Sequence, residues 1–164
     1  MKIEDRLLFL RYALPCASTL VKRGNVTQEY INRLIVLVSQ GKVPKEDVEN
    51  MFKVANAMCE SIAERMGKSA IDADVIRQYF LLEHSKVVDD RYQLMKDFNP
   101  VDCRVYAGRV LKVNDGYALV KTRLGKKLCS TVFAKKVKKG EEVAVHFDFI
   151  VEKIPAELAR RMEK

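Results

Sequence analysis

The sequence contains none of the local motifs that bind nucleotides or hold a catalytic zinc ion. It has no G-x-x-x-x-G-K and no G-x-G-x-x-G segment, and its seven glycines are scattered as turn and cap residues. The two histidines, His84 and His146, lie in no H-E-x-x-H segment and in no zinc-like array with cysteines. A Ser-His-Asp or Cys-His group meets only in space, so spacing alone leaves that class open. Because no local signature supports a reaction, we expect a protein that is not an enzyme.

Long apolar runs and an export signal are also absent. The longest strongly apolar run, Leu34–Val38, is far too short to span a bilayer. The N-terminal apolar block Leu7–Leu10 follows the acidic pair Glu4-Asp5, which is unlike a signal peptide. We therefore expect a cytoplasmic protein that makes no membrane contact.

Cysteines are few and widely spaced. Cys16, Cys59, Cys103 and Cys129 include no C-x-x-C pair, and the missing export signal favours reduced thiols over a disulfide framework. We interpret Cys59 as a core residue, Cys16 as a packing residue and Cys129 as structural. His84, at the end of an apolar helix face, is interpreted as a surface residue or a satisfied one rather than a ligand.

Positive charge is concentrated in the last part of the chain. Residues 1–100 carry 15 Lys and Arg against 14 Asp and Glu, whereas residues 101–164 carry 15 against 8. The second part therefore holds nearly all of the net charge of +8. This asymmetry favours two units with different surfaces.

Residues 1–98 have the apolar spacing of amphipathic helices. The first helix is expected from Met1 to about Leu14, where Pro15 interrupts it. Thr27 is expected to cap a second helix that ends at Gly41. Short connections between such helices predict a compact bundle.

Two further helices and a last segment complete the expected bundle. Pro44 is expected to open a helix that Gly67 stops, and Asp72 to cap the next one. The segment Val87–Phe98 either continues that helix or packs back as a fifth. The buried stripe of the helix before Gly67 is expected to contain Val48, Met51, Phe52, Ala55, Met58, Cys59, Ile62 and Met66.

Beyond Pro100 the apolar period changes from helical to alternating. Strands are expected at Val101–Val113, Tyr117–Arg123, Leu128–Phe133 and Val143–Val151. Turns are expected at Asn114-Asp115-Gly116, Gly125 and Lys138-Lys139-Gly140. His146 is expected on the polar side of the last strand, and Pro155 in the first turn of a terminal helix.

The predicted fold class is therefore α+β. An all-α helical bundle over residues 1–98 precedes a small antiparallel OB-like β-barrel with a short C-terminal helix over residues 101–164. The boundary is placed near Asn99-Pro100, where the period changes. Closing four or five short strands into a barrel removes the exposed edges of an open sheet.

One function open to such a barrel is binding of single-stranded nucleic acid. Small five-stranded barrels often bind single-stranded nucleic acid, and a rim of lysines would attract its phosphates. Stacking on bases needs exposed aromatic rings, however, and Phe147 and Phe149 are expected on the apolar face of their strand. We keep this as the alternative, with nucleic acid the less favoured partner. The rim lysines are Lys126, Lys127, Lys135, Lys136, Lys138 and Lys139.

A second function comes from a resemblance. The segment C-R-V-Y-A-G-R-V-L-K-V, residues 103–113, resembles the opening of the HypC/HupF family of hydrogenase maturation chaperones. The similarity continues through Y-A-L-V after the first turn, then through K-K-G-E-E-V-A-V-H-F and F-I-V-E-K-I. The resemblance covers about residues 102–164, and we identify none for residues 1–98.

The resemblance implies a small OB-like barrel that is not itself an enzyme. Members join a maturation partner, HypD, where iron with cyanide and carbonyl ligands is assembled, and carry it to the hydrogenase large-subunit precursor. The family's initial cysteine and a histidine near the last strand correspond to Cys103 and His146 here. Cys103 is thereby the expected ligand of a transient iron ion. His146, Arg104 and Gly108 complete the expected contact with partner and iron.

The chemistry of these residue types agrees with such roles. A thiolate is a soft donor suited to low-spin iron and to transient exchange. Arg104 and Arg109 lie close in sequence to Cys103 and are expected to favour its thiolate form. The sequence thus predicts an accessible thiol at the start of the barrel.

Overall fold

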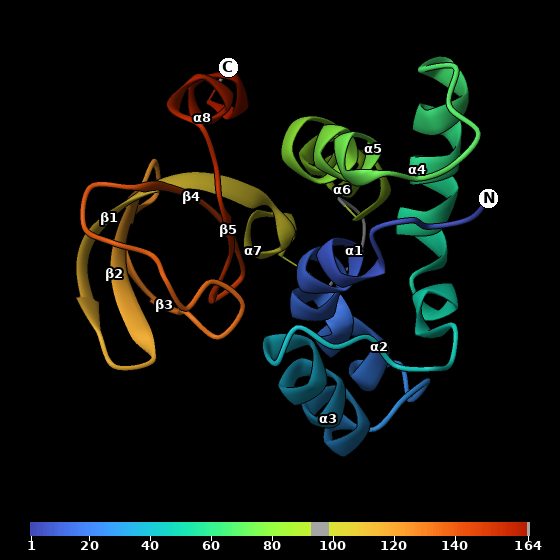
Figure 1. Ribbon diagram of the computed structural model, residues 1–164, viewed down its shortest axis with the longest axis horizontal. Helices are drawn as coiled ribbons and strands as arrows, with labels where there is room; N and C mark the ends of the chain where they lie inside the picture. The colour runs from blue at the N-terminus through green and yellow to red at the C-terminus, as the bar shows by residue number, and fades with distance from the viewer. Residues whose placement is uncertain (93–98, 164) are drawn as a thin grey trace. The chain divides into compact units, whose positions relative to one another are not determined.

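The computed structural model describes residues 1–92 and 99–163 and divides the chain into two compact units (Figure 1). Unit 1 is Met1–Phe80 and unit 2 is Leu81–Lys164. The predicted class is confirmed: helices come first, then a closed barrel of five strands and a short C-terminal helix. The sequence placed the boundary near Asn99-Pro100. The compact units meet earlier, after Phe80, so the helical residues 81–92 belong with the barrel.

Unit 1 consists of short helices, and its termini are set by local chemistry. The elements are α1 (Arg6–Ala13), η1 (Leu14–Ala17), α2 (Ser18–Lys22), α3 (Gln28–Ser39), η2 (Val48–Met51), α4 (Lys53–Arg65) and α5 (Ala73–Arg77). A π-helical segment, η3 (Gln78–Glu83), runs across the division between the units. Among the residues that the structure describes, no helix is both long and apolar enough to cross a membrane.

Most of the predicted helix ends are confirmed. The Thr27 side chain accepts a hydrogen bond from the backbone of Tyr30, and that of Asp72 accepts one from Val75. Gly41 and Gly67 follow α3 and α4 with φ of 74° and 66°, a left-handed conformation that glycine adopts without strain.

The first helix begins at Arg6 and not at Met1, and two details of the later helices are also wrong. Pro44 does not open a helix, because the chain forms only a single 3₁₀ turn at η2 before α4 begins at Lys53. The buried stripe also ends sooner than expected, and Met66, the residue after α4, is exposed. Of the segment Val87–Phe98, residues 87–92 continue the preceding helix and residues 93–98 lie outside the described residues.

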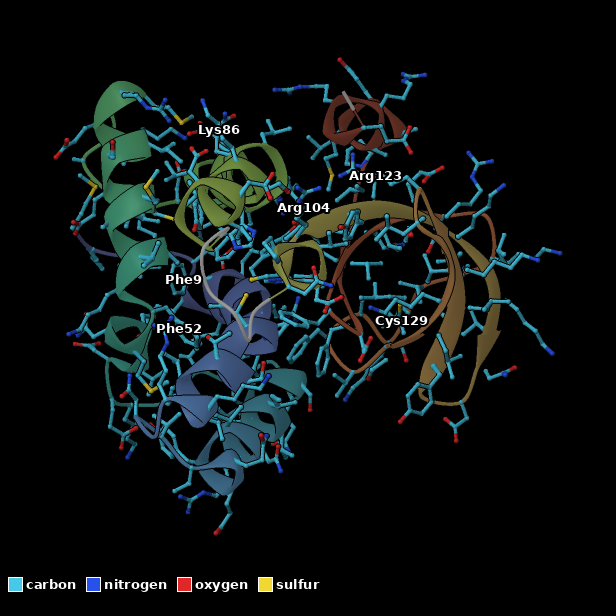
Figure 2. The ribbon with its side chains drawn as sticks, turned by 180° about the vertical axis from the view of Figure 1, so that it is seen from behind. Phe9, Phe52, Lys86, Arg104, Arg123 and Cys129 are labelled. Carbon is cyan, nitrogen blue, oxygen red and sulfur yellow. The ribbon has the colours of Figure 1, made fainter. Side chains whose placement is uncertain are left out.

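The core of unit 1 is built on aromatic contacts. Phe9 of α1 meets Phe52 and Phe80 edge-on, with ring centroids 6.4 and 6.0 Å apart, and Tyr12 stacks on Phe80 at 4.9 Å. Phe9 and Phe52 are labelled in Figure 2. Such pairs stabilise a core beyond the area that they bury, by about 0.5–1.5 kcal/mol each.

Unit 2 contains the barrel. The strands are β1 (Val105–Asn114), β2 (Tyr117–Thr122), β3 (Gly125–Ser130), β4 (Glu142–His146) and β5 (Phe149–Lys153). Their order around the barrel is β1-β2-β3-β5-β4, with β1 also paired to β4 and with β3 parallel to β5 (Figure 1). A closed five-stranded barrel of this order has the OB-like arrangement that the sequence predicted.

Two predicted strands need correction. Residues 101–103 of the expected Val101–Val113 strand belong to the helical turn Pro100–Cys103, and β1 begins only at Val105. The third strand lies earlier than Leu128–Phe133, because Gly125 itself begins β3.

The expected Val143–Val151 strand is in fact the hairpin of β4 and β5, which reverses at Phe147-Asp148. Phe147 has a φ of 49°, the positive value that a two-residue hairpin turn requires at its first central position. Glycine or asparagine usually takes that position, so the Phe-Asp pair gave no turn signal.

Small side chains fill the barrel interior. The buried cluster contains Val110, Ala118, Val120, Cys129, Val137, Val143, Val145 and Ile150. Cys129, labelled inside the barrel in Figure 2, is fully buried and acts as a small apolar residue there. Its structural role, predicted from the sequence, fits this position.

Three helices accompany the barrel in unit 2. They are α6 (His84–Tyr92), α7 (Pro100–Cys103) and α8 (Ala156–Met162). Helix α6 contacts α7, and α8 packs on β1 and β4. Arg104, directly after α7, donates two hydrogen bonds to the Asp89 carboxylate of α6 at 2.6 Å, which fastens α6 to the start of β1.

The compact units predict that a fragment of residues 81–164 is more stable than one of residues 100–164. The shorter fragment lacks α6, whose His84 and Val88 are buried and whose Asp89 pairs with Arg104. We expect it to lose about 2–4 kcal/mol of unfolding free energy. Urea unfolding of both fragments measures the difference. Equal stabilities would place the boundary at Pro100 instead.

Candidate metal centre

One thiol and two imidazoles meet in unit 2. His84 is the first residue of α6, Cys103 is the last of α7 and His146 is the last of β4. The potential ligand atoms of these three residues lie within 4.8 Å of one another. Three separate elements therefore bring soft and borderline donors to one point. We call this group the His-Cys-His cluster.

A hydrogen bond defines the tautomer of His146. Its Nε2 lies 3.0 Å from the carbonyl oxygen of Cys103, and a carbonyl can only accept, so Nε2 carries the proton. In a neutral ring Nδ1 then has a lone pair. A ligand histidine commonly donates its second N–H to a backbone carbonyl in this way, which fixes the ring for the metal.

His84 is held in its neutral form. Burial is the main cause and lowers the pKa of its imidazole below the usual value, while a hydrogen bond with Cys103 opposes the shift and His146 adds to it. The two imidazole rings meet edge to face with centroids 5.3 Å apart. Neutral imidazole is the form that binds metal ions.

The structure buries the predicted cysteine and the predicted histidine. Cys103 is 5% exposed and His146 is 0% exposed, so the accessible thiol and the polar-side histidine expected from the sequence are corrected. Alternation places a residue in solvent only where one face of the strand is exposed, and β4 has no exposed face at these positions. In the structure the side chains of β4 from Val143 to His146 are all buried, since Val143 and Val145 lie in the barrel interior and α8 packs on the strand.

His84 is the member of the cluster that the sequence reasoning missed as a ligand. It was interpreted as a surface or satisfied residue, yet it is 5% exposed and shares the buried side of its helix with Leu81 and Val88. Leu81 and Val88 lie three positions before and four positions after His84, and this spacing on one helix face was the sequence signal for its burial. It indicates burial, but only the fold places His84 beside Cys103.

Arg104 lies beside the cluster and has an ion-pair partner. Its pairing with Asp89 raises the pKa of the guanidinium, so it stays charged. It also lines a cavity of about 530 Å³ together with Lys86 of α6 and Arg123, all three labelled in Figure 2. Arg109, the other arginine expected near the thiol, pairs with Glu142 and is directed to the exterior.

Gly108, the fourth predicted contact residue, has a packing role. A Cβ built on it would lie 2.5 Å from Cγ1 of Val120 and 3.2 Å from Cγ2 of Thr122 on the neighbouring strand β2. Only glycine fits at this crossing of β1 and β2. Packing against β2 therefore accounts for the glycine at position 108, and no contact with a partner protein is needed to explain it.

The remaining thiols behave differently from one another. Burial raises the pKa of Cys59 to about 12 and that of Cys129 to about 11. Cys59 lies in α4, where it was predicted as core. Cys16, in η1 of unit 1, is half-buried.

Comparison with protein-family models and with curated sequences found no match. The argument about function therefore depends on the site itself.

Substituting Gly108 with alanine is expected to destabilise the barrel by about 1–3 kcal/mol, because the new methyl group collides with Val120. Chemical denaturation measures the loss. The double variant Gly108→Ala/Val120→Ala removes the colliding methyl groups, so its loss should be smaller than the sum of the single losses. Strict additivity would show that the contact with Val120 is not the cause.

Cys59 and Cys129 are expected to resist alkylation in the folded protein. Their raised pKa values leave at most about one thiol in a thousand ionised at pH 8, and both are buried. Mass-spectrometric mapping of labelled peptides, with and without denaturant, measures the protection. Labelling of either residue at the rate of a free thiol would show that its side chain is not buried.

Proposed function

We propose that this protein is an adaptor in metallocentre assembly, similar in role to the HypC/HupF chaperones. Its barrel would bind a maturation partner resembling HypD and a hydrogenase large-subunit precursor, and Cys103 and His146 would contact the iron in transit. The observation that carries the proposal is the meeting of these two side chains, 43 positions apart in the chain.

The positions of the resembling segments support the proposal. The first segment covers the end of α7 and most of β1, and Y-A-L-V opens β2. The segment that ends in V-H-F spans β4, and F-I-V-E-K is β5. The resemblance therefore follows the strands of one barrel in order, and its cysteine and histidine meet at one place.

Burial of the thiol sets a requirement for this function. A thiolate that passes a metal to another protein must become accessible during exchange. Cys103 is the last residue of α7, which has only four residues. Displacement of so short a helix on partner binding would expose the thiol while the barrel strands stay paired.

The cavity that Arg104 lines, with four basic and three acidic side chains in its lining, offers a contact for the partner. Lys86, Arg104 and Arg123 line it, and Arg104 adjoins Cys103 in the chain. An acidic segment of a partner bound there would compete with Asp89 for Arg104. Such competition would loosen α6 from the start of β1, next to the thiol.

Binding of single-stranded nucleic acid is the second candidate. Tyr117, at the start of β2, is 52% exposed, and Lys126 and Lys127 on β3 are exposed as well. Tyr117 pairs with Ser130 at the end of β3, however, so the stacking ring and the lysines lie toward opposite ends of this strand pair. Other aromatic residues of the barrel are engaged: Phe133 stacks on Phe149, and Arg123 covers the ring of Tyr106. A single free ring favours the adaptor over this candidate.

Affinity capture from the native cell tests the proposed function. The full-length protein is expected to retain a hydrogenase large-subunit precursor or a maturation partner. Cys103→Ser and His146→Gln are expected to lower the recovered amount about tenfold or more, because each removes one iron contact. Lys126→Ala serves as a surface control. Recovery of ribosomes or nucleic acid instead, reduced by Lys126→Ala, would contradict the adaptor and favour the second candidate.

A further inference from the structure

A third donor extends the pair of residues that the resemblance supplies. His84 belongs to α6 and precedes the resembling segment, which begins at about residue 102. Its imidazole hydrogen-bonds the thiol of Cys103 and lies edge to face with that of His146. A site with two ligands, one of them a thiolate, suits transient exchange of a metal ion. A site with three converging ligands suits retention of the ion.

We propose that His84, Cys103 and His146 hold a resident divalent transition-metal ion when no partner protein is bound. Zinc is the metal that matches these ligands best. The inference shares with the proposed function only the premise that Cys103 is a metal ligand. It needs no partner protein and no iron with cyanide or carbonyl ligands.

The separations fit such an ion. Zinc binds thiolate sulfur at about 2.3 Å and imidazole nitrogen at about 2.0–2.1 Å, so tetrahedral ligand atoms stand about 3.4–3.6 Å apart. The three donors already lie within 4.8 Å of one another. They need to close by about an ångström, which side-chain rotation supplies, and the fourth position takes water or another donor.

The surroundings fit as well. The Cys103 carbonyl accepts the hydrogen bond from Nε2 of His146, so the lone pair of a neutral ring is on Nδ1, which is the nitrogen left to bind a metal. His84 is neutral because it is buried. The only proton that must leave on binding is that of the Cys103 thiol, so one ion releases about one proton to solvent.

The donor set selects the class of metal. One thiolate and two imidazoles suit zinc and its neighbours in the first transition series, whereas magnesium and calcium require oxygen ligands. No carboxylate belongs to this group of donors. The ion would join α6, α7 and β4, which are three separate elements of the chain.

Metal titration of the full-length protein tests the proposal. Metal-free protein, prepared with a chelator under reducing conditions, is titrated with Co²⁺ and then with Zn²⁺. One equivalent of Co²⁺ should give the intense visible absorption of a tetrahedral site and a thiolate charge-transfer band, and Zn²⁺ should displace it. Zinc should also raise the unfolding temperature, because it binds the folded state.

Variants identify the ligands. Cys103→Ser should abolish the charge-transfer band, and His84→Gln and His146→Gln should each weaken zinc binding about 100-fold or more. Cys59→Ala is the matched control, a buried cysteine outside the cluster, and should keep wild-type affinity. Circular dichroism of each metal-free variant verifies that it is folded.

The wild-type titration alone can overturn the proposal. An octahedral Co²⁺ spectrum, or no binding at micromolar concentration, would contradict it whether or not any variant folds. Unchanged zinc binding by a folded His84→Gln variant would also contradict it. Wild-type protein that binds zinc one to one but captures no maturation partner or precursor would refute the proposed function and support this site.

Discussion

The structure of unit 2 depends on the burial of one thiol and two imidazoles beside the barrel. A buried polar group without a partner costs about 1–3 kcal/mol, so such groups are buried together or not at all. Here the Cys103 carbonyl accepts from His146, and the Cys103 thiol meets His84. This requirement ties the start of α6 and the end of α7 to the last residue of β4, and it explains why unit 2 begins before the barrel.

The same requirement connects fold and function. The OB-like barrel provides a rigid strand, β4, that presents His146, while the short helix α7 presents Cys103. A donor on a strand and a donor on a four-residue helix differ in mobility. A site of this kind can retain a metal ion while α7 is packed, and the proposed partner exchange requires only that α7 moves.

Local chemistry explains which parts of the fold were predictable. The caps at Thr27 and Asp72 and the Asp115-Gly116 hairpin turn each depend on residues within four positions of one another, and all three were predicted correctly. The Phe147-Asp148 turn was missed because its positive φ is maintained by the pairing of β4 with β5 and not by a turn-forming residue. Helix α7 was missed because the alternating pattern continues across it.

The candidate site was only half predictable for a related reason. Cys103 and His146 were found through resemblance, whereas His84 lies outside the resembling segment and has a helix-face pattern typical of any buried residue. Its role as a donor depends on contacts between α6, α7 and β4, and a single sequence does not encode those contacts in any local pattern. Burial of His146 likewise depends on β4 being covered on both sides.

X-ray absorption at the zinc edge of the zinc-loaded full-length protein tests the central claim most directly. The account predicts a first shell with sulfur at about 2.3 Å and two imidazole nitrogens at about 2.0 Å, with the multiple scattering typical of histidine rings. The sulfur contribution should disappear in Cys103→Ser. A shell of six oxygen or nitrogen atoms without sulfur would contradict the account, since it would place the ion away from the His-Cys-His cluster.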